Sequence, residues 1–128
     1  ALTAAARALG LADRTFAGTV HTKDSLYGRE FATGPQAQDN ARYMEVLTRA
    51  GVLASEMEAS HLFILAATHT ARPARSLADP TTDADIVKAG TVLAIISDDR
   101  PWASAEVIRE TEERAIDLAL AGLAQLEA

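Results

Sequence analysis

The chain has 128 residues, 48% of them hydrophobic, and a formal net charge of −6. This length and composition predict one modest domain with a buried core, and the acidic charge argues against nucleic acid as a partner, which needs a basic surface. The absence of cysteine excludes disulfides and thiolate chemistry.

Membrane and metal-binding patterns are missing from the sequence. The apolar runs are short and the N-terminus has no basic region of a signal peptide. None of the three histidines has a Cys or His partner at ligand spacing. We therefore expect a soluble, cytoplasmic protein with no membrane partner and no metal. The missing initiator Met and the helical pattern at residue 1 indicate a processed or truncated chain.

The first 38 residues predict a helix, a strand and a polar loop. Apolar positions share one face over residues 1–9, and Gly10 suits the position just after a helix. Residues 15–21 alternate as a strand does. The polar stretch 21–30 follows, and by pattern alone it is a surface loop with a turn at Gly28.

Two further helices are expected in the middle of the chain. Asp39 or Asn40 can cap a helix that ends at Gly51. The second helix covers 59–67, is apolar over a wide arc and should be buried. Residues 71–85 are polar, contain two prolines and predict an exposed loop.

The last third predicts a buried strand and a long helix. Residues 91–96 form a continuous apolar run, typical of a strand in a parallel or mixed sheet covered by helices. The final helix should begin near Ser104. The order helix, strand, helix, short strand, helix, strand, helix predicts an α/β fold. Polar segments 23–29, 56–58 and 97–100 follow strands, and parallel strands would bring all three to one sheet edge.

The stretch 52–61 holds two carboxylates, Glu56 and Glu58, at a junction between a strand and a helix. Ser55-x-x-Glu58 before an apolar run matches a capping box, in which Glu58 reaches back to the Ser55 backbone N–H. The alternative is that a carboxylate accepts hydrogen bonds from the two hydroxyls of a vicinal diol, a charge-assisted arrangement. The spacing leaves both interpretations open.

Two motifs resemble the nucleoside phosphorylase superfamily. Ala54-Ser55-Glu56-Met57-Glu58-Ala59 is similar to its Glu-Met-Glu signature. Thr22-Lys23-Asp24-Ser25-Leu26-Tyr27-Gly28, after Gly18-x-Val20, resembles the base-binding loop of the uridine phosphorylase branch. The resemblance implies a three-layer α/β/α fold with a mixed central sheet, and the predicted elements follow the family order over nearly all 128 residues.

The resemblance also implies a reaction. Nucleoside phosphorylases cleave a nucleoside with inorganic phosphate as co-substrate and no other cofactor, giving a free base and ribose 1-phosphate. Glu58 would hold the 2′ and 3′ hydroxyls and favour positive charge developing on the sugar. Met57 would pack on the ribose, and Glu56 would lie beside the sugar and base.

By the same resemblance, base contacts would come from the loop that holds Leu26 and Arg29 and from the later segment that holds Asp98 and Asp99. Leu26 stands where the family often has an aromatic residue, and it offers apolar contact without a π face. Arg29 stands where relatives often carry Gln; it can stabilise a negative leaving base but has donors only. Ser97-Asp98 resembles purine-cleaving relatives, whose aspartate protonates the leaving base, which implies a catalytic Asp98 and a base contact from Asp99. An exposed turn is the alternative for both aspartates.

The resemblance covers only the C-terminal half of a family member. Residues 1–128 would form the C-terminal portion of a single nucleoside phosphorylase-like domain, apparently incomplete, because the Gly-rich phosphate loop, the phosphate-binding arginines and the first strands are missing. The family is usually a hexamer assembled from dimers, which implies a homo-oligomer. Three alternatives stay open: a purine nucleoside phosphorylase, a hydrolytic nucleosidase and a non-catalytic nucleoside-binding domain.

Overall fold

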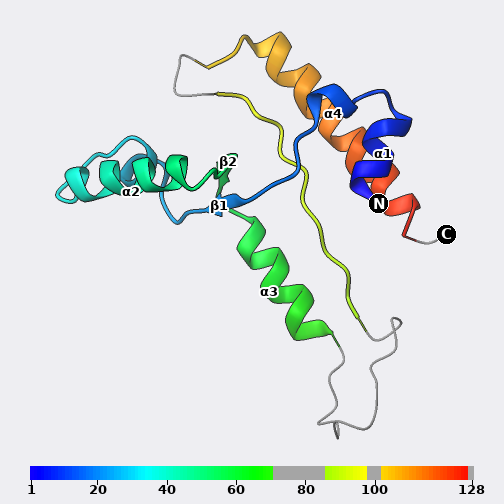
Figure 1. The fold of residues 1–128 in the computed structure, drawn as a ribbon, viewed down its shortest axis with the longest axis horizontal. Coiled ribbons are helices and arrows are strands. Elements are labelled where there is room, and N and C mark those ends of the chain that lie inside the picture. Colours follow the sequence, from blue (N-terminus) through cyan, green and yellow to red (C-terminus); the bar gives the residue numbers. More distant parts are fainter. Residues whose placement is uncertain (71–85, 98–101, 127–128) are drawn as a thin grey trace, which may run out of the picture. The chain divides into compact units, whose positions relative to one another are not determined.

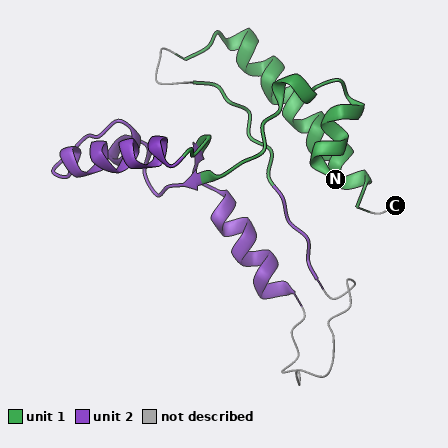
Figure 2. Cartoon of the chain, viewed as in Figure 1, with its two compact units in different colours: residues 1–20, 51–54, 91–128 green, residues 21–50, 55–90 purple. Residues whose placement is uncertain are grey.

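The computed structural model describes residues 1–70, 86–97 and 102–126, and Figure 1 labels its helices and strands. It has α/β character, with mostly helical elements and a small parallel sheet of two strands. Two compact units divide the chain (Figure 2): residues 1–20, 51–54 and 91–128 belong to the first unit, and 21–50 and 55–90 to the second.

The first unit is built on two packed helices, α1 (Leu2–Ala8) and α4 (Ala105–Ala124). Ala5, Ala6 and Leu118 form its core. Gly122 lets the helices approach closely, since a Cβ at that position would lie 2.5 Å from the Leu2 Cδ2 atom. The predicted helix start is confirmed: Ser104 precedes α4 and its hydroxyl accepts a hydrogen bond from the Val107 amide.

Glycines end two helices as predicted. Gly10 follows α1 with φ +69°, and Gly51 follows α2 (Ala37–Arg49) with φ +75°. This left-handed conformation is strained for residues with a Cβ. The predicted start of α2 is wrong, because Gln36 is at its N-cap position and Asn40 lies inside the helix, where it is buried.

The second unit contains a π-helical turn (Leu26–Glu30), α2 and α3 (Ala59–His69). The turn packs against α2. Burial of α3 was predicted, but that prediction is wrong, because four of its large apolar side chains are exposed: Leu62, Phe63, Ile64 and Leu65. In the described part of this unit, no other helix packs extensively on that surface.

The sheet joins β1 (Val20–Thr22) to β2 (Ala54–Glu56) in parallel, and α2 lies between them in sequence. The segment from β1 to β2 is therefore a βαβ unit. Segments 23–29 and 56–58 leave the same edge of the sheet, as predicted. The described residues 86–97, which lead to the third polar segment, form no strand, and residues 98–100 of that segment lie outside the described part of the chain.

The strand predicted for 91–96 is not formed. Residues 86–97 have no regular secondary structure, although Val92 packs against the Ala5, Ala6 and Leu118 cluster. An apolar run becomes a strand only where a neighbouring strand pairs with its backbone groups, and the described residues supply no such neighbour. The predicted 71–85 loop lies outside the described residues.

Candidate functional site

The two motifs that resemble the phosphorylase signatures meet along β1 and β2. The Lys23 amide donates to the Glu56 carbonyl at 2.8 Å, and the Thr22 hydroxyl donates to the Glu56 carboxylate. The Ser55 hydroxyl lies 3.2 Å from the His21 Nδ1 atom. These contacts join residues more than 30 positions apart in the sequence, so the strand pairing brings the polar loop and the Glu-Met-Glu segment together.

Lys23 has a buried ammonium group at this junction. Its side chain is 4% exposed, its Nζ atom lies 2.7 Å from a Glu30 carboxylate oxygen, and it donates to the Ser55 hydroxyl at 2.9 Å. Sequence reasoning did not single out Lys23 or Glu30. The spacing of His21 and Lys23 could have indicated that both face the same neighbour, because alternate residues of an extended segment lie on one face.

Glu56 caps the N-terminus of α3. One of its carboxylate oxygens accepts from the backbone amides of Glu58 at 2.7 Å and Ala59 at 2.6 Å. Partial desolvation opposes ionisation of Glu56, but hydrogen bonds from Thr22, Ala59 and Glu58, with the charge of Lys23, outweigh it and lower its pKa. The predicted capping box is therefore wrong: Ser55 is in β2, and Glu56 satisfies the free amides instead.

We expect Glu56 to stabilise the fold in a pH-dependent way. Because its pKa is lowered on folding, its contribution is present above the pKa of the unfolded chain, about 4.3 for Glu, and is lost as pH falls through the folded value. Urea unfolding of wild type and Glu56→Gln should show the variant less stable at pH 7, with the difference shrinking below about pH 4.5. A difference that stays constant with pH would contradict this role.

Glu58 and Met57 are exposed at the start of α3. Glu58 is the N-cap residue, and its Oε2 atom accepts from the Met57 amide at 3.1 Å. It does not reach back to Ser55. Among the described residues, no side chain donates to the Glu58 carboxylate, which leaves acceptor capacity for a ligand. Met57 is 37% exposed beside it. Of the two carboxylates, Glu56 is therefore used within the fold and Glu58 is open.

The predicted base-binding loop is an ordered turn. The Ser25 hydroxyl accepts from the Gly28 amide at 3.0 Å, and the π-helical turn begins at the half-buried Leu26. The aromatic surface nearest Leu26 in sequence belongs to Tyr27, which is 69% exposed and contacts the Phe31 ring edge-on. The turn thus presents the aromatic surface of Tyr27 directly after Leu26.

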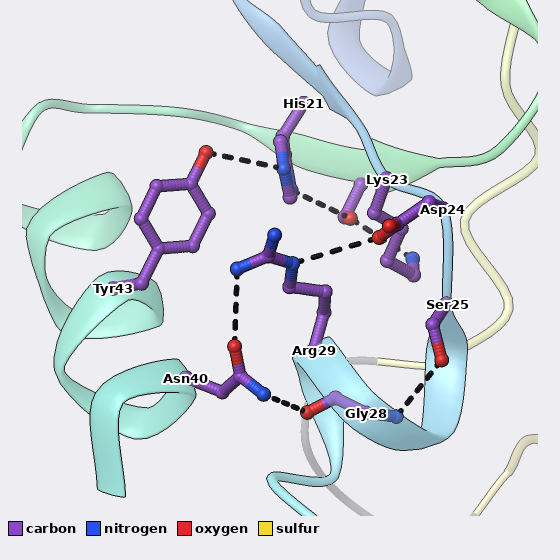
Figure 3. A network of polar contacts seen from close by, with 9 residues as sticks. His21, Lys23, Asp24, Ser25, Gly28, Arg29, Asn40 and Tyr43 are labelled. Carbon is purple, nitrogen blue, oxygen red and sulfur yellow. Dashed lines mark hydrogen bonds and ion pairs between the residues drawn. The ribbon is translucent and has the colours of Figure 1, made fainter. Parts of the chain in front are cut away.

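Arg29 points from this turn into a network of polar contacts (Figure 3). Its Nη1 atom donates to the Asn40 Oδ1 atom at 3.0 Å, and its Nε atom lies 3.5 Å from an Asp24 carboxylate oxygen. The guanidinium carbon lies 5.2 Å from the centre of the Tyr43 ring, within the range of a cation–π contact. The resemblance implies that Arg29 lies near the base, but it does not identify these partners.

Asn40 and Tyr43 could have been noticed from the helix pattern. Asn40 lies three, four and seven residues before Tyr43, Met44 and Leu47, so it shares the apolar stripe of α2. A polar residue on a face that packs against another element needs hydrogen-bond partners. Tyr43 also contacts His21, with ring centres 5.4 Å apart and the hydroxyl 3.4 Å from the Nε2 atom.

Asp98 and Asp99, the predicted acid and base contact, lie outside the described residues. Across the part of the chain that the structure describes, no group of three or more His, Asp or Glu side chains could hold a metal ion. Within the same ranges, no helix is both long and apolar enough to cross a membrane.

Comparisons with protein-family models, with curated proteins and with solved structures found no match for this chain. What can be proposed about its function therefore rests on the residues of the site: an open carboxylate at Glu58, a carboxylate used as a cap at Glu56, and an arginine held in place beside the turn that follows β1.

Proposed function

We propose that this chain supplies the ribose- and base-binding part of a nucleoside phosphorylase site, with uridine or a related pyrimidine nucleoside and inorganic phosphate as substrates. One observation carries the proposal. The two motifs that resemble this family are hydrogen-bonded to each other along neighbouring parallel strands, and both leave the same edge of the sheet. Ligands of α/β proteins bind at such edges.

In this proposal phosphate is the nucleophile. A phosphate oxygen bonds to the C1′ carbon, the bond from C1′ to the base nitrogen breaks, and the electron pair stays with the base. Glu58 accepts hydrogen bonds from the 2′ and 3′ hydroxyls, and its charge favours the positive sugar of the transition state. Met57 lies against the ribose, and Glu56 holds the chain between Met57 and α3.

At the other end of the substrate, the leaving base needs stabilisation of negative charge or a proton. Arg29 donates to a carbonyl oxygen of the base, and Leu26 gives it apolar contact. Asp98 is proposed as the acid, with Asp99 beside the base.

We also propose a source for the phosphate-binding groups and a complete fold. The phosphate-binding groups come from residues outside these 128, and the complete fold is a three-layer α/β/α domain with a mixed central sheet. We propose a homo-oligomer in the cytoplasm, in agreement with the oligomers that the family forms. The apolar side chains of α3 that are exposed in the described residues support burial by further chain or by a partner subunit.

The test is uridine cleavage followed by ultraviolet absorbance, with and without phosphate, on protein of verified intact mass. Release of uracil that requires phosphate is the expected result. Release without phosphate would identify a hydrolytic nucleosidase. Binding of uridine without cleavage, in protein whose mass includes the missing half, would identify a nucleoside-binding domain and overturn the proposal. Inosine and guanosine in the same assay separate purine from pyrimidine cleavage.

A further inference from the structure

Asn40 is a buried amide whose two ends have different partners. It is 7% exposed, its Nδ2 atom donates to the Gly28 carbonyl at 2.8 Å, and its Oδ1 atom accepts from Arg29 at 3.0 Å. A carbonyl can only accept and a guanidinium can only donate, so these two partners determine the orientation of the amide. Asn40 therefore ties the Arg29 side chain to the backbone of the turn that carries it.

The Arg29 guanidinium is held on three sides but is not covered. Asn40 accepts from Nη1, Asp24 faces Nε, and the Tyr43 ring lies against the guanidinium (Figure 3). The side chain is still 39% exposed. Among the described residues, no acceptor pairs with its Nη2 atom. Hydrogen-bond donors remain there for a ligand.

We propose that Asn40 is the positioning residue that holds Arg29 ready to donate to a carbonyl oxygen of the nucleobase. This inference rests on the proposed function. A long arginine side chain loses conformational freedom when it binds, and holding it beforehand removes that cost. Since Arg29 has no acceptor, it pairs with the C4 carbonyl of uracil and opposes the C4 amino group of cytosine. Asn40 thereby contributes to selection of uridine over cytidine.

Two variants with a side chain branched at the same carbon as Asn separate the positioning role from a structural one. Asn40→Asp and Asn40→Leu both lose the hydrogen bond to the Gly28 carbonyl, but only Asp keeps an acceptor for Arg29. Asn40→Ala replaces Asn40→Leu if the leucine is not tolerated. The measurement is kcat/KM for uridine and for cytidine with phosphate. We expect Asn40→Asp to keep the uridine-to-cytidine ratio and Asn40→Leu to lower it about tenfold, mainly through KM for uridine.

Each variant is also made in an Arg29→Ala background. If Asn40 acts through Arg29, removal of the amide has no further effect on the ratio there. An equal effect in both backgrounds, or an unchanged ratio in Asn40→Leu, would overturn the proposal. Calorimetric titration with uracil and cytosine follows the same preference without turnover. If the protein shows no turnover but prefers uracil in a way that depends on Asn40, the proposed reaction is overturned and the positioning role stands. If it shows neither turnover nor a preference for uracil, both proposals are overturned.

Discussion

Replacing Glu58 by Gln is expected to lower kcat/KM for uridine phosphorolysis by about 10²–10³-fold. Gln has nearly the same shape, but its amide is neutral and presents one acceptor oxygen where the carboxylate presents two. The decrease in kcat/KM should therefore reflect weaker stabilisation of the transition state. The free energy of unfolding should change by less than about 1 kcal/mol, because Glu58 is exposed and its carboxylate accepts from the neighbouring Met57 amide.

Glu45→Gln is the matched control for Glu58→Gln. Glu45 is also an exposed glutamate of the second unit, and it pairs with Arg49 one turn along α2. Such a pair contributes only a few tenths of a kcal/mol, so this variant should keep both its activity and its melting temperature. A Glu58→Gln variant that melts far below wild type but turns over normally would show that Glu58 is structural and would remove it from the catalytic residues.

Replacing Lys23 by Met should produce the largest loss of stability among the site residues, about 2–4 kcal/mol. Met keeps most of the apolar stem but removes the ammonium group that pairs with Glu30 and donates to Ser55. The partly covered Glu30 carboxylate would then lack its ion-pair partner, and among the described residues the Ser55 hydroxyl would keep only its contact with His21. Leaving such a covered charge unpaired is what makes the change costly. The measurement is the free energy of unfolding from urea titration at pH 7.

Lys88→Met controls for the loss of one positive charge. Lys88 is exposed in the second unit, and exposed substitutions of this kind change stability by less than about 0.5 kcal/mol. The double variant Lys23→Met, Glu30→Gln should be less destabilised than the sum of the two single variants, because each single change already breaks the same ion pair. Strict additivity, or a Lys23→Met variant as stable as Lys88→Met, would contradict a stabilising role for the buried ammonium.

Glu56 and Glu58 show why the spacing of a motif does not decide which of two carboxylates caps a helix and which is free to bind a ligand. Ser55-x-x-Glu58 has the spacing of a capping box, yet Glu56 provides the cap and Ser55 faces Lys23 and His21. The reason is that the strand includes Ser55 and continues to Glu56, and α3 begins only at Ala59, so Ser55 does not stand at the helix N-terminus. Where one element ends and the next begins therefore decides which carboxylate is left open for a ligand.

Features that depend on near neighbours along the chain could be predicted from the amino-acid sequence. Apolar spacing predicted α1, α2, α3 and α4, and glycines marked the ends of two of them, because helix periodicity and a left-handed backbone are local properties. The same local pattern was misleading for residues 91–96, since a strand depends on a partner that the pattern does not contain. The resemblance of two short motifs indicated the candidate site.

The roles of the site residues depend on contacts between distant parts of the chain. Burial of Lys23, capping by Glu56 and the hold of Asn40 on Arg29 each depend on a second chain segment or on the exact start of a helix. Lys23 and Ser55 are 32 positions apart, and Arg29 and Asn40 are 11 apart on different elements. A side chain forms hydrogen bonds with the groups that lie within about 3 Å of it in space. For residues far apart in the sequence, that distance is set by the folded structure, here by the pairing of β1 with β2, and not by their order in the chain.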